Sequence, residues 1–153
     1  MDYQQVAESV MQEACMRPDW GVRDLAIWLR DGCRCVYCGK DMLESYDAVF
    51  YGGSLDHLLP KGEYREIEDV DWNRVLSCRA CNTIKNIFDP NKTGDLYLKG
   101  TKSISDSARY ALIDRVKAFI DEKRLPKDRF HQQRDLILKA LRTSGLSASA
   151  ASA

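Results

Sequence analysis

The chain has 153 residues, 44% of them hydrophobic and 30% charged, which is the composition of a folded globular protein and excludes a disordered chain. Its 23 basic and 23 acidic residues cancel, so no net positive charge points to a polyanionic partner. No run approaches the roughly 20 apolar residues of a membrane span, and the first ten residues lack the basic and apolar regions of a signal peptide. We therefore expect a cytoplasmic protein with one core of ordinary size.

Two helices are expected in the N-terminal region, residues 1–32. Residues 2–16 have few helix breakers, and apolar residues recur four apart, the spacing of one helix face. These residues are Val6, Val10 and Ala14. Asp19 is positioned to cap a second helix, which ends at Asp31-Gly32. The apolar residues of that helix are Leu25, Ile27, Trp28 and Leu29.

Between residues 33 and 88 the helical period disappears. Two short apolar runs, Ala48–Tyr51 and Leu55–Leu59, are separated by Gly52-Gly53, and this pattern predicts a hairpin. The segment from Ser77 to Ile87 contains neither Gly nor Pro and suits a short helix. The expected order is strand, strand, helix.

A polar loop at 91–102 leads to a second helical region, residues 103–143. Ser105 can cap its first helix, whose apolar residues fall on one side. They are Ala108, Leu112, Val116, Phe119 and Ile120. Pro126 is expected to begin the second helix, with a face formed by Phe130, Arg134, Ile137, Leu138 and Leu141. Residues 144–153, rich in Ser and Ala, are expected to form a disordered tail.

The C-terminal helices are also the basic part of the chain. Residues 99–153 carry 12 basic and 6 acidic side chains, whereas residues 1–60 carry 5 and 10. This asymmetry could supply a cationic face for nucleic acid, although an ordinary solvated surface could show the same excess.

Four of the six cysteines form two C-x-x-C pairs. The pairs are Cys35 with Cys38 and Cys78 with Cys81. Each pair can present two thiolates from one tight turn, and together they complete a tetrahedral zinc site with no open position, so the zinc would be structural. Redox chemistry is the alternative, but two correctly spaced pairs in a reducing compartment favour zinc. Cys33 is left out of the ligand set, and Cys15 is expected to be a buried thiol.

The segment between the two cysteine pairs, Gly39 to Ser77, is far longer than the roughly 15 to 20 residues of a plain zinc ribbon. Within it, Asp56 and His57 adjoin in an apolar run. Because neighbours in a strand point to opposite faces, one of the two reaches a polar site whichever face is buried. A surface Asp-His pair is the alternative interpretation.

Several short motifs follow one another along the chain. They are Arg30-Asp31-Gly32, Cys35-Val36-Tyr37-Cys38-Gly39, Asp56-His57 with Pro60, Asn73, Cys78-Arg79-Ala80-Cys81-Asn82 and Lys85. In order and spacing they resemble the HNH endonucleases over about a third of the chain. The resemblance implies an α+β fold in which a small ββα-metal core, residues 33–88, is braced by the zinc site. It also implies a single nuclease domain over residues 1–143, with helices flanking the core.

The resemblance further implies a role for each motif residue. His57 would be the general base that takes a proton from the attacking water, and Asp56 with Asn82 would hold one Mg²⁺ or other divalent cation against the scissile phosphate. Carboxylate and amide oxygens suit Mg²⁺, and a neutral imidazole suits proton abstraction near pH 7. Asn73 would pin the loop that joins the strands to the helix. Its alternative is an ordinary turn or capping residue.

Three basic side chains beside the motif are candidates for contact with the substrate: Lys61, Arg79 and Lys85. Lys85 lies three residues after Asn82, so the two share a helix face on which Lys85 could contact phosphate. Otherwise Lys85 is a solvated surface lysine.

The resemblance thus implies a divalent-metal-dependent endonuclease acting on nucleic acid, DNA in particular. Two features depart from the family pattern: Asn82 stands where the family name has His, and the acidic segment 62–71 lacks the usual Gly-Gly. That segment could repel phosphate, add a metal ligand or bind a protein. The alternative functions are a zinc-stabilised nucleic-acid-binding module without turnover and a protein-interaction subunit. The flanking helices could also form a homodimer or a larger assembly.

Overall fold

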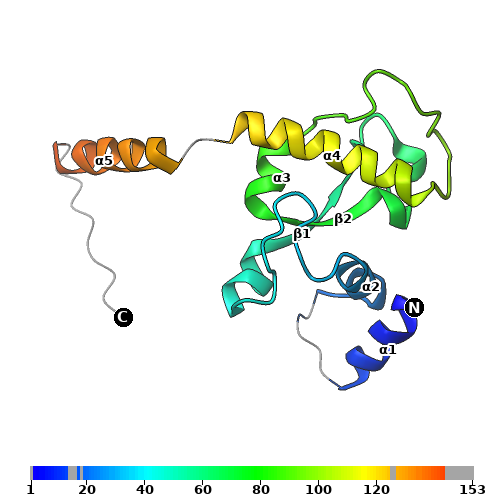
Figure 1. The fold of residues 1–153 in the computed structure, drawn as a ribbon. Helices are drawn as coiled ribbons and strands as arrows, with labels where there is room; N and C mark the ends of the chain where they lie inside the picture. The colour runs from blue at the N-terminus through cyan, green and yellow to red at the C-terminus, as the bar shows by residue number, and fades with distance from the viewer. Residues whose placement is uncertain (1, 14–16, 18, 125–126, 144–153) are drawn as a thin grey trace. The chain divides into compact units, whose positions relative to one another are not determined.

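The computed structural model describes residues 2–13, 17, 19–124 and 127–143 (Figure 1). The described residues combine helices with one two-stranded sheet, which confirms the α+β class. The chain divides into two compact units, Met1–Glu122 and Lys123–Ala153, and each is described by itself. None of the described helices is both long and apolar enough to cross a membrane. Four predictions fall outside the described residues: the tail at 144–153, the helix start at Pro126, the buried thiol of Cys15 and the position of Ala14 on the first helix face.

Helices α1 (Tyr3–Glu13) and α2 (Val22–Arg30) pack against each other. Helix α2 buries three of the four apolar residues expected of it, Leu25, Ile27 and Trp28, while Leu29 is partly buried. Helix α1 buries Ala7, whereas Val6 stays 39% exposed. Its buried face consists of Ala7 with the partly buried Val10 and Met11, so Val10 of the predicted face packs on the core and Val6 does not.

The N-terminal end of α2 differs from the prediction. Gly21, and not Asp19, precedes the first turn, and the Gly21 amide donates a hydrogen bond to Oδ2 of Asp24 at 3.1 Å. Asp19 instead pairs with the guanidinium of Arg17, which donates to both carboxylate oxygens. A charge-assisted pair of this kind competes successfully with a helix cap for the same carboxylate.

Strands β1 (Gly53–His57) and β2 (Arg74–Cys78) pair antiparallel, with Gly53 opposite Cys78 and His57 opposite Arg74. The predicted hairpin is wrong, since Ala48–Gly52 forms a turn of π-helix and the partner of β1 comes after residue 73. Gly53 marks where β1 passes the indole of Trp28. A Cβ at that position would lie 2.5 Å from Cη2 of the indole, so only glycine fits there.

Helix α3 (Arg79–Lys85) follows β2 directly, with Cys78 as its N-cap residue, and it packs on both strands. The short helix predicted there exists but begins two residues later, because Ser77 and Cys78 belong to β2. Side chains alternate along a strand, so Ser54 and Asp56 face α3 while Leu55 and His57 leave β1 on the other side. This arrangement positions the candidate site.

Helix α4 (Asp106–Lys123) begins as predicted, since Oγ of Ser105 accepts a hydrogen bond from the Ala108 amide at 3.2 Å. It buries the predicted apolar side, and its Phe119 ring stacks on Phe88 with centroids 4.0 Å apart. Helix α5 (Lys127–Thr143) belongs to the second unit. Phe130 and Ile137 of its predicted apolar face are 57% and 61% exposed.

Candidate functional site

The four cysteines of the two C-x-x-C pairs meet in space. The Sγ atoms of Cys35, Cys38, Cys78 and Cys81 all lie within 4.8 Å of one another. Zinc–sulfur bonds of about 2.3 Å in a tetrahedron separate the sulfurs by about 3.8 Å, and the Sγ atoms of Cys38 and Cys78 are 3.7 Å apart. The cluster therefore fits a metal ion such as zinc. Over the described part of the chain, no other group of three or more His, Cys, Asp or Glu side chains lies close enough to share an ion.

Local backbone structure builds this cluster from two separate segments. The first pair sits in a tight turn closed by the Gly39 amide donating to the Cys35 carbonyl at 2.8 Å, with φ of +73° at Gly39. The Val36 amide donates to the Leu76 carbonyl at 2.9 Å and so attaches this turn to β2. Cys78 ends β2 and caps α3, so a bound ion would join the turn, the strand and the helix.

Asp56 lies at the centre of a buried polar cluster between β1 and α3. Only 6% of the residue is exposed, and its Oδ2 accepts a hydrogen bond from the Tyr37 hydroxyl at 2.7 Å. Nζ of Lys85 lies 3.3 Å from Oδ2 and 3.4 Å from Oδ1. Burial raises the pKa of Asp56, and the charge of Lys85 and the Tyr37 hydrogen bond oppose this rise.

Lys85 does not lie on the surface. It is 2% exposed, and its ammonium also donates to the His57 carbonyl at 2.7 Å. The alternative of a solvated surface lysine is therefore wrong. A phosphate contact would require this ammonium to leave Asp56.

Asn82 stands one helical turn before Lys85 on the same side of α3. Its Nδ2 donates to Oγ of Ser54 at 3.0 Å, two residues before Asp56 on β1. Among the described residues, none donates a hydrogen bond to Oδ1 of Asn82. The two predicted Mg²⁺ ligands, Asp56 and Asn82, thus come from facing elements that contact each other.

His57 ends β1 with a half-buried ring on the side of the strand opposite Asp56 and Asn82, so the structure does not bring its side chain together with theirs. Burial, followed by the positive charges of Lys61 and Arg74, lowers the pKa of His57 to about 4, while a hydrogen bond to the Glu68 backbone opposes the shift. The imidazole is consequently neutral at pH 7.

Asn73 is fully buried and braces a loop through its side-chain amide. Oδ1 accepts from the Leu59 amide at 2.7 Å, and Nδ2 donates to the carbonyls of Leu59 at 3.4 Å and Ile67 at 3.2 Å. The braced loop is the one between β1 and β2. It is not a loop between strands and helix, because α3 follows β2 without one.

The remaining two predicted substrate contacts, Lys61 and Arg79, are exposed. Lys61 lies in the turn after Pro60, and Arg79 is the first residue of α3. Within the described ranges neither forms an ion pair, so both are available to bind an anion at the surface.

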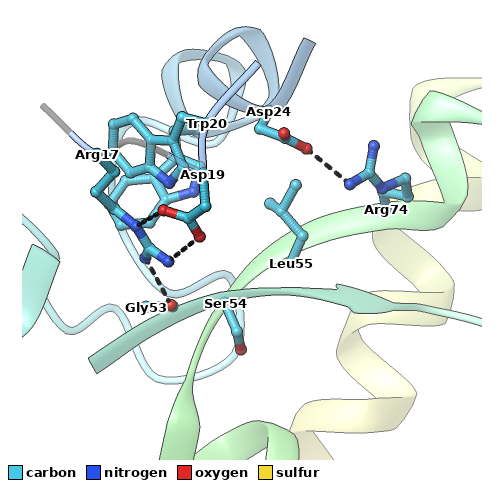
Figure 2. A pocket seen from close by; sticks show the side chains of 9 residues that line it. Arg17, Asp19, Trp20, Asp24, Gly53, Ser54, Leu55 and Arg74 are labelled. Carbon is cyan, nitrogen blue, oxygen red and sulfur yellow. Dashed lines mark hydrogen bonds and ion pairs between the residues drawn. The ribbon is translucent and has the colours of Figure 1, made fainter. Parts of the chain in front are cut away.

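A cavity of about 240 Å³ opens on the other side of β1 (Figure 2). Two ion pairs line it, Arg17 with Asp19 and Arg74 with Asp24, and Figure 2 shows Leu55 projecting between them while Ser54 points away. None of the motif residues that resemble a nuclease site lines this cavity.

Sequence reasoning missed two residues that organise the site. Tyr37 lies between the two cysteines of the first pair, and its hydroxyl holds Asp56. Asp31, whose side chain is 1% exposed, accepts from the Leu76 amide at 2.7 Å and pairs with Arg109 at 2.9 Å, so it fastens β2 to α2 and α4. The position of Asp31 in the Arg30-Asp31-Gly32 motif was the sequence feature that could have indicated this role.

Comparison of the chain with protein-family models finds no match, and comparison with curated protein sequences finds none either. The function of the site therefore rests on its own geometry.

Proposed function

We propose that the protein is an HNH-type endonuclease that hydrolyses phosphodiester bonds in nucleic acid, DNA in particular. The observation that carries this proposal is the meeting of β1 and α3, where Ser54 contacts Asn82 and Asp56 contacts Lys85. The cysteine cluster that brackets the two elements would hold a structural zinc ion.

The residues present fit a hard divalent cation. Asp56 offers a carboxylate and Asn82 an amide oxygen with no hydrogen-bond donor among the described residues, and Mg²⁺ prefers such oxygen ligands. Mg²⁺ commonly keeps several waters, so two protein ligands suffice. When bound, the cation would supply neutralisation of charge on the phosphate and the leaving oxygen.

His57 would take the proton from the attacking water. Its neutral ring can accept a proton at pH 7. Exposed Lys61 and Arg79 would attract the phosphate backbone. A phosphate beside the ring would oppose the effect of Lys61 and Arg74 and raise the pKa of His57 toward the working pH.

A cleavage assay tests the proposal. The zinc-loaded protein is incubated with supercoiled plasmid, single-stranded DNA and RNA, with Mg²⁺ or with chelator. We expect metal-dependent cutting that falls at least about a hundredfold in His57→Ala, since general-base catalysis contributes about that much. The matched control is His131→Ala, which changes the other histidine of the chain, on α5. Unchanged cutting by His57→Ala would refute the assigned base.

A second candidate function is favoured by the burial of Asp56, whose charge Lys85 already neutralises. The same scaffold could bind nucleic acid or a protein without turnover. This candidate predicts a shift of DNA mobility with no cutting under any divalent metal. Recovery of one stable protein partner without nucleic-acid affinity would favour the protein-interaction version.

A further inference from the structure

Lys85 is a buried charge that the proposed mechanism does not use. Its side chain is 1% exposed, and its ammonium contacts both carboxylate oxygens of Asp56 and the carbonyl of His57. A buried ammonium persists only where such oxygen atoms replace its hydration.

The ammonium of Lys85 lies among oxygen atoms that a metal ion could use as ligands. A carboxylate and a carbonyl oxygen are the ligands that hard cations prefer, and Asn82 lies one turn away on the same helix face. A divalent cation on Asp56 would lie close to the ammonium of Lys85, and the two positive charges would repel each other in a poorly solvated site. Lys85 and the cation therefore compete for Asp56.

A neighbouring cavity offers the ammonium another position. It has a volume of about 640 Å³, and Lys85 and Glu63 are among the residues that line it, together with Ile84, Phe88, Asp89 and Phe119. The Asp89 carboxylate already accepts hydrogen bonds from the Tyr64 hydroxyl and the Asn91 amide. Glu63 is exposed and forms no ion pair with any described residue, so it is the carboxylate best placed to receive the displaced ammonium.

We infer that Lys85 is an internal cation that occupies the catalytic metal position at Asp56, and that a divalent metal binds by displacing its ammonium into the adjoining cavity toward Glu63. The inference rests on the proposed function in taking Asp56 as a metal ligand. It assigns a role to one residue of the acidic segment 62–71, namely that of alternative partner for Lys85.

Binding of Mn²⁺ tests the inference without an activity readout. Free Mn²⁺ is measured by electron paramagnetic resonance in titrations of the zinc-loaded protein. Lys85→Met removes the competing charge and keeps an apolar stem of similar length, so we expect Mn²⁺ to bind at least about tenfold more tightly. The gain should vanish in the double variant Asp56→Asn with Lys85→Met. Lys99→Met, which changes an exposed lysine that does not line this cavity, is the matched control and should bind like the unmodified protein.

A second variant keeps the test decisive if Lys85→Met fails to fold. Glu63→Gln removes the alternative partner at an exposed position, and we expect Mn²⁺ binding to weaken about twofold to fivefold, the range of an exposed ion pair. Glu66→Gln, also exposed and in the same acidic segment, should have no effect.

Each outcome separates the inference from the proposed function. Equal or weaker Mn²⁺ binding by a folded, zinc-loaded Lys85→Met, or equal binding by Glu63→Gln and Glu66→Gln, would overturn the displacement of Lys85. Absence of any Mn²⁺ binding that depends on Asp56 would overturn both this inference and the metal assignment. Tighter binding by Lys85→Met without cleavage of any nucleic acid would support the displacement and overturn only the nuclease.

Discussion

Asn73 satisfies three backbone groups of one loop with a single buried amide. The acceptor oxygen and the donor nitrogen of the Asn73 amide both form hydrogen bonds. No other residue of similar size can replace Asn73 without leaving a buried polar group unpaired. The loop that it braces carries Leu58, Leu59 and Ile67, all fully buried. One side chain thus couples the end of β1 to the hydrophobic core.

Asn73→Asp should destabilise the fold by about 3 kcal/mol, because a carboxylate would face the carbonyls of Leu59 and Ile67 without a proton to donate. Urea denaturation of the zinc-loaded protein measures the change. Asn82→Asp is the matched control and should cost clearly less, since the Ser54 hydroxyl can rotate and donate to the new oxygen. Equal losses of unfolding free energy in the two variants would contradict the role of Asn73 in bracing the loop.

His57 should make the fold less stable as the pH falls from about 6.5 to about 4. Its pKa in the fold is about 4, below the 6.5 of an unperturbed histidine, so the unfolded chain binds more protons between these values and gains from acidification. Asp56, whose pKa is raised, acts in the opposite direction. Melting temperatures of the protein and of His57→Asn across this range measure the effect.

The variant should show the weaker dependence on pH, and His131→Asn should behave like the unmodified protein. An equal or steeper dependence in His57→Asn would show that the fold does not hold the ring neutral.

At the scale of elements, the cysteine cluster joins three pieces: the turn at Cys35–Gly39, β2 and α3. A two-stranded sheet is marginal by itself, and α3 has only seven residues. The turn at Cys35–Gly39 adds a single backbone hydrogen bond to β2 through Val36. A metal ion held by all four thiolates would therefore carry much of the stability of this region.

Cys38→Ser should abolish stoichiometric zinc binding and lower the melting temperature, because a hydroxyl does not replace a thiolate ligand. Zinc content by mass spectrometry and thermal denaturation with and without chelator measure this. Cys33→Ser is the matched control. Cys33 is partly buried beside the cluster but is not one of its four cysteines, so that variant should keep about one zinc per chain. Loss of zinc from Cys33→Ser would revise the ligand set.

At the scale of the whole molecule, charge is divided between the two compact units. Residues 1–122 carry 16 basic and 21 acidic side chains, whereas residues 123–153 carry 7 and 2. The unit that holds the candidate site is acidic overall, which opposes binding of a polyanion. For the proposed nucleic-acid substrate, the basic residues of α5 would therefore be the main source of long-range attraction.

Replacing Arg129, Lys139 and Arg142 of α5 by Gln should weaken DNA binding and lower the slope of log affinity against log salt by up to about 3, roughly one unit for each lost phosphate contact. Fluorescence anisotropy at several salt concentrations measures the slope. Replacing Gln132 and Gln133 by Ala changes the same helix without changing its charge and is the control. An unchanged slope in the triple variant would exclude α5 from the nucleic-acid interface.

The sequence alone was sufficient for features that depend on local chemistry. The two C-x-x-C pairs predicted one cluster, and Ser105 with the apolar spacing after it predicted α4, because ligand spacing and helix capping act over a few residues. The predicted hairpin was wrong because it, too, was inferred from features of only a few neighbouring residues. Residues 48–51 carry a strand-like composition, but nothing local shows that β1 would pair with a segment beyond residue 73.

Only the tertiary structure decided which side chains surround Asp56. Tyr37 and Lys85 lie 19 and 29 residues from Asp56 in the chain. Nothing in the sequence around either residue indicates that its side chain is buried. Lys85 appeared suited to solvent, yet it is buried because α3 packs on β1 where a carboxylate and a carbonyl replace water around its ammonium. The sequence determined which chemical groups the protein holds, while packing decided their partners, because the cost of burying a charge depends on atoms that only the fold brings together.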